Sequence, residues 1–242
     1  MIKVDCINAS TIVTDEQVHD VVNALGIQVM RDWEPIWGVP CELFFVPKGQ
    51  APDPKHWWLT FLDDSDQADA LGYHDLTTEG HTLGKVFVRS TIQSGGKWSV
   101  TASHELLEML GDPDINLSAY VLNEEQTRIY FYAYEVADAV ESDQYGYDIN
   151  GVLVSDFVTP AFFEPFVPAS VPLDFKGFVT KSLQILPGGY LSILDPTNGL
   201  GWQQLYGAQA RLSARYRGKI GSRREKRRTR RSDWRISTVK TK

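Results

Sequence analysis

Cysteine is nearly absent from this chain, whose 242 residues include only Cys6 and Cys41 and no C-x-x-C pair. So few thiols exclude a disulfide-stabilised scaffold and a zinc site made of thiolates. No stretch approaches the roughly 20 consecutive apolar residues that a membrane-spanning helix requires. The first residues also lack the apolar run of a signal peptide. We therefore expect a cytoplasmic or particle-associated protein without a transmembrane segment.

Several loops that carry common chemistries are also missing. The sequence contains no G-x-x-x-x-G-K-[ST] or G-x-G-x-x-G loop, so it gives no support for nucleotide binding. It contains no G-x-S-x-G element, so it gives no support for a serine hydrolase. A functional site must therefore be sought in other patterns.

Positive charge is scarce in most of the chain and concentrated at its C-terminal end. Residues 211–242 contain 14 Lys and Arg and 2 acidic residues, a net charge of +12, which leaves 10 basic and 29 acidic residues, a net charge of −19, in residues 1–210. This asymmetry predicts a globular domain over residues 1–205, rich in β-structure from about residue 118, and a basic arm over residues 206–242.

The natural partner of such an arm is a polyanion, either nucleic acid or an acidic protein surface. Repulsion between its like charges favours an extended conformation in the absence of a partner. The alternatives are an arm that folds onto the acidic body of the same chain and an arm that serves only as a solubilising tail.

The hydrophobic pattern predicts helices and strands in a mixed order. Thr14 and Gln17 form a capping-box pattern, and the apolar spacing that follows indicates a helix to about Trp33. Strands are predicted at residues 42–46, 56–62 and 84–89, and hairpins within residues 120–134, 147–157 and 182–194. Apolar and polar residues alternate in 84–89, which indicates a half-exposed strand at a sheet edge. The order indicates an α+β fold with a mixed sheet, an N-terminal helix and a central helix, followed by β-hairpins.

The most informative pattern is the segment H-E-L-L-E over residues 104–108, within the central helix. It nearly matches the zinc-peptidase motif H-E-x-x-H, in which ligands at i and i+4 share one helical face and the glutamate acts on water as a general base. His104 and Glu108 keep that spacing, and Glu105 occupies the position of the base. A carboxylate also binds zinc, so Glu108 preserves a site while leaving the metal and the activity open. The alternative is that these side chains form the solvated face of an amphipathic helix.

The residues after this segment extend it to H-E-x-x-E-x-x-G-x-x-D over residues 104–114. Gly111 suits a left-handed cap at the C-terminal end of the helix. Such a chain reversal would allow Asp114 to swing back to the metal. The edge strand predicted before the helix would offer its backbone to an extended substrate.

Residues 71–114 resemble the core of a zincin metallopeptidase, with an edge strand, an active-site helix and a glycine turn. The spacing is most similar to the snapalysin-like group, whose third zinc ligand is an aspartate after that turn. The resemblance implies that His104 and Asp114 are metal ligands and that Glu105 is the general base. Glu108 departs from the family pattern at the second ligand.

Glu135 offers an alternative third ligand. Another zincin branch takes this ligand from a glutamate well downstream, supported by an aspartate a few residues beyond, and Glu135 and Asp138 have this spacing. In that case Asp114 only caps the turn, while a third possibility is that Glu135, Asp138 and Glu141 lie on a solvated surface. Each ligand set has one imidazole and two carboxylates, and so many oxygen ligands shift the preference from zinc toward manganese or calcium. We expect zinc, with manganese or calcium as alternatives.

Two further histidines, His74 and His81, flank the predicted edge strand. They could line a cleft or donate a hydrogen bond to an oxyanion, although histidines in such positions are usually ordinary surface groups.

Three functions fit these patterns. The first is a zincin-like metal-dependent hydrolase of peptide or protein substrates, with weaker catalysis than a two-histidine site because two anionic ligands reduce the acidity of the metal. The second is a zincin-fold protein with little or no catalysis and a structural or assembly role. Most of residues 40–200 resemble uncharacterised bacterial and phage proteins with this near-motif, so that role would suit a phage virion, with the arm bound to nucleic acid or neighbouring subunits. The third is a metal-stabilised binding module.

Overall fold

The structure, a computed structural model, describes residues 1–67, 70–77, 79–123, 125, 127–207 and 228–229. It contains helices and three β-sheets, so the predicted α+β class is confirmed. The predicted domain boundary at residue 205 falls within the last described stretch before residue 208, and nearly all of the predicted basic arm lies outside the described residues. Among the helices described, none combines the length and the apolar composition that a membrane span requires.

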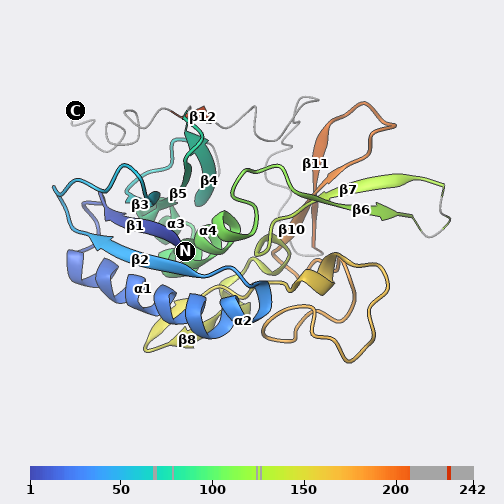
Figure 1. The fold of residues 1–242 in the computed structure, drawn as a ribbon, viewed down its shortest axis with the longest axis horizontal. Coiled ribbons are helices and arrows are strands. Elements are labelled where there is room, and N and C mark those ends of the chain that lie inside the picture. The colour runs from blue at the N-terminus through green and yellow to red at the C-terminus, as the bar shows by residue number, and fades with distance from the viewer. Residues whose placement is uncertain (68–69, 78, 124, 126, 208–227, 230–242) are drawn as a thin grey trace.

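The first half of the chain forms a six-stranded sheet with helices packed against it (Figure 1). Its strands are β1 (Ile2–Asn8), β2 (Cys41–Val46), β3 (Trp57–Leu62), β4 (Gly72–Thr77), β5 (Thr82–Phe87) and the two-residue β12 (Arg228–Thr229). They lie in the order β12-β4-β5-β3-β1-β2. β1, β2, β3 and β5 are mutually parallel, whereas β4 runs antiparallel to β5. The sheet is therefore mixed, with its antiparallel strand next to β5.

The prediction that residues 84–89 form an edge strand is wrong. β5 lies between β3 and β4 and is buried along its whole length. The misleading alternation includes Lys85, whose buried ammonium group donates hydrogen bonds to Asp66 and to the Tyr73 hydroxyl, so this cation does not need a solvent-exposed position. β4 lies on the other side of β5 from β3 and pairs with the outermost strand, β12, at Leu76 and Thr77.

Two long helices pack against this sheet. α1 (Asp15–Gln28) contacts β1 and β2, and α4 (Trp98–Gly111) contacts β3, β4 and β5. The predicted capping box is confirmed, because Thr14 and Gln17 each accept a hydrogen bond from the other's backbone N–H. Helical structure continues beyond the predicted end at Trp33, through a π-helical segment η1 (Val29–Trp33) into α2 (Glu34–Trp37). A short helix, α3 (Val88–Gln93), precedes α4.

The second half of the chain is richer in irregular segments. A four-stranded sheet has the order β11-β10-β7-β6, and a separate hairpin pairs β8 with β9. The elements are β6 (Ser118–Leu122), β7 (Ile129–Ala133), η2 (Asp138–Val140), η3 (Asp143–Tyr145), β8 (Tyr147–Ile149), β9 (Val152–Val154), η4 (Pro160–Phe163), β10 (Tyr190–Leu194) and β11 (Trp202–Tyr206). The first two predicted hairpins are confirmed. The third is wrong, because β10 pairs with β7 and β11 instead of residues 182–186.

A buried hydrogen-bond network joins α1, α4 and the β8–β9 hairpin. Ser103 Oγ donates to Gln28 Oε1 at 2.7 Å. Gln28 Nε2 donates to the Tyr147 hydroxyl at 3.0 Å and to the Ser155 carbonyl at 2.9 Å. These groups satisfy one another away from water, which favours a single arrangement of the elements. Because Ser103 immediately precedes His104, the network fixes α4 where the sequence motif lies.

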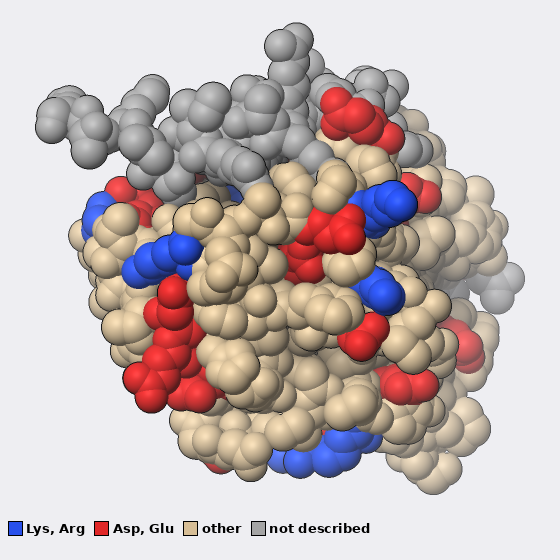
Figure 2. All heavy atoms as spheres, turned by 60° about the vertical axis from the view of Figure 1, so that its left-hand side comes forward, with Lys and Arg blue, Asp and Glu red and all other residues tan. Residues whose placement is uncertain are grey.

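Acidic side chains predominate among the charged groups on one described face. In the view of Figure 2, acidic side chains (red) cover more of the described face than basic side chains (blue), which form separate groups. This distribution agrees with the net charge of −19 carried by residues 1–210.

Candidate metal centre

The H-E-x-x-E segment of α4 faces the protein interior. His104, Glu105 and Glu108 are 6%, 4% and 4% exposed, respectively. The interpretation of these residues as a solvated helix face is therefore wrong. Burying carboxylates is unfavourable unless other groups pair with them, and the partners come from segments distant in the sequence.

The first group of potential metal ligands consists of His104, Glu108 and Asp138. His104 Nε2 lies 3.2 Å from Glu108 Oε1 and 3.3 Å from Asp138 Oδ1. Burial lowers the pKa of His104, but the charge of Glu108 and the contact with Asp138 outweigh it, so this pKa lies well above its usual value. Burial and the nearby charge of Glu108 raise the pKa of Asp138 well above the normal range of a carboxyl group.

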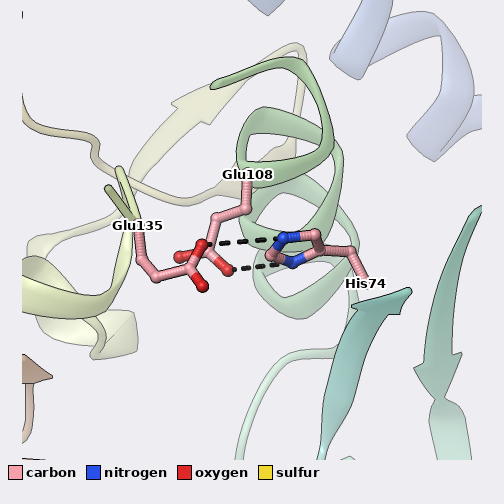
Figure 3. Close-up of side chains that lie close together, drawn as sticks. All are labelled: His74, Glu108 and Glu135. Carbon is pink, nitrogen blue, oxygen red and sulfur yellow. Dashed lines mark ion pairs between the residues drawn. The ribbon is translucent and has the colours of Figure 1, made fainter. Parts of the chain in front are cut away.

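The second group consists of His74, Glu108 and Glu135, which point toward one another (Figure 3). His74 comes from β4, and its Nδ1 lies 3.4 Å from Glu108 Oε2. Its Nε2 lies 3.6 Å from Glu135 Oε2. Burial raises the pKa of Glu108, but the two imidazoles, His104 foremost, outweigh it and hold this pKa well below the usual value. The carboxylate of Glu108 therefore belongs to both groups.

Glu105 lies beside the second group. Its Oε2 is 3.8 Å from His74 Nδ1 and accepts no hydrogen bond from the part of the chain that the structure describes. Gly72 of β4 makes room for this side chain, because a Cβ atom there would lie 2.6 Å from Glu105 Oε1. A larger residue at position 72 would therefore displace the carboxylate that the motif assigns to general-base catalysis.

The loop that follows β7 packs directly on α4. Gly111 does not form a left-handed cap, so that prediction is wrong: it is the last residue of α4, and positive φ occurs at other glycines. A Cβ atom on Gly111 would lie 2.8 Å from Val136 Cγ1. The absence of a side chain thus permits the close approach of the loop, whose Ala137 N–H donates to Glu108 Oε1 at 3.4 Å. Glu135 and Asp138 flank this contact.

Two more ionisable side chains border the centre. Burial, together with the negative charges of Asp138, Glu141 and Glu108, raises the pKa of Tyr190 well above its usual value. Burial also raises the pKa of Glu141 to about 7, with Glu108 and Glu105 acting in the same direction. The charge of His104 acts against this increase at Glu141, whereas the charges named at Tyr190 are all negative.

The structure brings together four of the five residues predicted from the sequence. His104, Glu105 and Glu108 meet the downstream Glu135. Asp114 is exposed on the turn after α4 and belongs to neither ligand group. Gly111 remains helical, so the chain makes no left-handed reversal there that would direct residue 114 toward the motif.

Sequence reasoning missed the roles of His74 and Asp138. The interpretation of His74 as a surface group is wrong, since it is only 1% exposed. It lies 30 residues before His104 in a strand that the pattern did not predict, so no spacing connects the two. Asp138 was expected to support Glu135 but lies in the group of His104 instead. His81, the other histidine beside the predicted strand, belongs to neither group.

The donor atoms have the spacing that a metal ion requires. In each group, one imidazole nitrogen and two carboxylate oxygens lie within 4.8 Å of one another. Ligand atoms about 2.0–2.2 Å from one metal lie roughly 3–3.5 Å apart, and the two contacts of the first group, both to His104 Nε2, are 3.2 and 3.3 Å. In the second group, the contacts of 3.4 and 3.6 Å involve different ring nitrogens of His74. These buried His, Glu and Asp groups could therefore hold a metal ion.

The chain matches no protein-family model, no curated protein and no solved structure. The comparisons therefore neither support nor contradict the zincin resemblance.

Proposed function

We propose that the protein is a zincin-like metal-dependent hydrolase of peptide bonds, with a metal ion held by His104, Glu108 and Asp138. The observation that carries this proposal is the convergence of three donor atoms on one buried point. Both contacts of this group involve the same nitrogen, Nε2 of His104, at 3.2 and 3.3 Å. One metal ion can therefore reach all three residues with little rearrangement.

The topology around α4 supports the proposal. The zincin resemblance implies an edge strand beside an active-site helix, and β4 lies against α4. Strand β12 pairs with β4 at Leu76 and Thr77.

The chemistry would be divided between the metal and Glu105. When bound, a divalent metal acts as a Lewis acid that polarises a substrate carbonyl and increases the acidity of water. Glu105 would accept a proton from the attacking water and return it to the departing amine. His74, whose Nδ1 lies 3.8 Å from Glu105 Oε2, would keep that carboxylate oriented.

The donor set also bears on the identity of the metal. One imidazole and two carboxylates suit zinc and manganese. Calcium prefers ligand sets made of oxygen alone, which makes it the weakest of the three candidates. We therefore propose zinc as the first choice and manganese as the second.

Substitution of Glu105 tests the hydrolase directly. Glu105→Gln should reduce cleavage of unstructured protein substrates on the order of 10²–10⁴-fold, because the amide cannot accept the proton. Metal content, measured by mass spectrometry of the purified protein, should remain that of the wild type. Asp114→Asn, at the exposed acid of the same motif, is the matched control and should retain full activity. Absence of metal from the wild type after zinc and manganese supplementation would contradict the proposal.

A structural role for the metal is the second candidate, and the burial of the centre favours it. The five side chains of the two ligand groups are 1–6% exposed. Two surface hollows, one lined by Asn123, Arg128 and Tyr130 and the other by residues 1–3, 53 and 55–57, contain none of them. Stoichiometric metal without any cleavage dependent on Glu105 would support this structural role, which suits a component of an assembly such as a virion.

We also propose that the basic arm binds a polyanion, such as nucleic acid or an acidic protein face. Its support is the net charge of +12 in residues 211–242. Truncation after Gln209 should abolish salt-sensitive binding to a DNA duplex, because binding through phosphates weakens steeply as salt increases. Unchanged affinity of the truncated chain in a fluorescence anisotropy titration would exclude the arm as the binding element.

A further inference from the structure

The two oxygens of Glu108 face two different histidines. Oε1 lies 3.2 Å from His104 Nε2, and Oε2 lies 3.4 Å from His74 Nδ1. Figure 3 shows the carboxylates of Glu108 and Glu135 facing the imidazole of His74. Glu108 is the only residue common to the two ligand groups found among the described residues. Its position is therefore that of a link between two neighbouring centres.

The two centres have matching compositions. Each contains one imidazole, one carboxylate of its own and one oxygen of Glu108, with Asp138 completing the first centre and Glu135 the second. In two-metal sites the ions lie about 3.5–4 Å apart, a separation that a single carboxylate can bridge. A histidine at position 108 could not do this while neutral, since its imidazole has only one nitrogen free to bind a metal.

Two divalent cations would also balance the charge of the region better than one. Glu105, Glu108, Glu135 and Asp138 are each no more than 4% exposed. If all four are ionised and both histidines are neutral, as metal ligation demands, the cluster carries four negative charges. One divalent ion leaves two of them uncompensated in a buried site, whereas two divalent ions balance them. Glu105 Oε2, which accepts no hydrogen bond from the described residues, faces His74 of the second centre.

We propose that the protein binds two divalent first-row metal ions, bridged by the carboxylate of Glu108. The first ion is the one in the proposed function, on which this inference rests. The second ion is held by His74, Glu108 and Glu135. The first centre should bind more tightly, because its two contacts share one nitrogen, whereas those of His74 involve both ring nitrogens. In this arrangement Glu108, which replaces the second histidine of H-E-x-x-H, is the residue that joins the two ions.

Manganese is the most informative probe of this arrangement. The full-length protein, freed of metal and titrated with Mn²⁺ alone, should bind two ions per chain in two steps of unequal affinity, measured by calorimetry and metal analysis. Electron paramagnetic resonance of the fully loaded protein should show the spectrum of an exchange-coupled Mn²⁺ pair. Saturation at one ion would overturn the second centre and leave the proposed function intact. Binding of no ion would overturn both.

Conservative variants separate the two centres. Glu135→Gln and Asp138→Asn should each reduce the stoichiometry from two ions to one and abolish the coupled spectrum. Glu108→His restores H-E-x-x-H and should likewise hold one ion, uncoupled. Asp114→Asn, which removes an acid outside both groups, should still bind two. Circular dichroism checks that each variant is folded; retention of a coupled pair in Glu108→His would overturn the bridge.

Discussion

The two regions that build the metal centre are held in place by different interactions. Up to the end of α4, parallel strands and helices join backbone groups in repeating patterns. Beyond α4, buried aspartates hold irregular segments by accepting backbone N–H groups. Asp112 accepts from Asn116 and Leu117, Asp156 from Phe157 and Lys176, and Asp174 from Phe178 and Val179. Regular elements thus position the histidines, whereas Glu135 and Asp138 lie in the irregular segment after β7, which Val158 and Leu186 hold through backbone hydrogen bonds to Val136 and Ala139.

The largest difference between the two regions should appear on metal removal. At a metal concentration a thousand times the dissociation constant, binding stabilises the folded state by about 4 kcal/mol. Chelation should therefore lower the melting temperature, and the loss should fall mainly on the irregular region. Hydrogen exchange should accelerate at residues 133–141 far more than in β1 and β3. An equal increase in both regions would contradict the distinction.

A smaller effect should come from the pH dependence of the aspartates. Burial and the neighbouring Asp174 raise the pKa of Asp156 to about 9, compared with about 3.9 in an unfolded chain. Folded protein therefore retains a proton that unfolded protein releases, and the stabilisation is fully present below pH 4 and declines as pH rises toward 9. Asp156→Asn removes this titration. As pH rises from 4 toward 9, the free energy of unfolding of the variant should therefore increase relative to that of the wild type, by up to about 1.4 kcal/mol per pH unit.

Denaturant unfolding at pH 5 and pH 7 measures this effect. Asp148→Asn is the control, because Asp148 is exposed and accepts a local hydrogen bond from Gly151 N–H in a turn. Its pH dependence should follow that of the wild type. Parallel pH profiles for Asp156→Asn and the wild type would show that Asp156 does not hold a proton in the folded protein.

The smallest effect should come from two helical glycines, of which only Gly111 packs against the irregular region. Gly111→Ala places a Cβ atom 2.8 Å from Val136 Cγ1, and overpacking of this kind destabilises by about 1–3 kcal/mol. It should also weaken metal binding, since it displaces the loop between Glu135 and Asp138. Gly26→Ala in α1 meets no atom within 4 Å and should stabilise by roughly 0.5–1 kcal/mol. Equal effects of the two substitutions on metal affinity would contradict the role of Gly111.

Local patterns predicted those parts of the fold that local interactions determine. The capping box at Thr14, the i, i+4 pair on α4 and the Asn150-Gly151 turn depend on residues within one turn of chain. The position of β5 did not follow from its pattern, because Lys85 finds its partners across the fold. The same limit applies to the site. Glu135 was proposed from a family spacing, whereas His74 reaches the centre through the pairing of β4 with β5.

The distribution of the ligands along the chain has a consequence for synthesis. His74 and Glu135 are separated by 61 positions, and neither ligand group is complete until the segment containing Glu135 and Asp138 has been made. Contacts between such distant residues require the closure of long loops and form late in folding. A nascent chain released before residue 135 would contain both histidines and the whole α4 motif but no finished centre. Metal should therefore bind only after the segment containing Glu135 and Asp138 has been translated and has folded against α4.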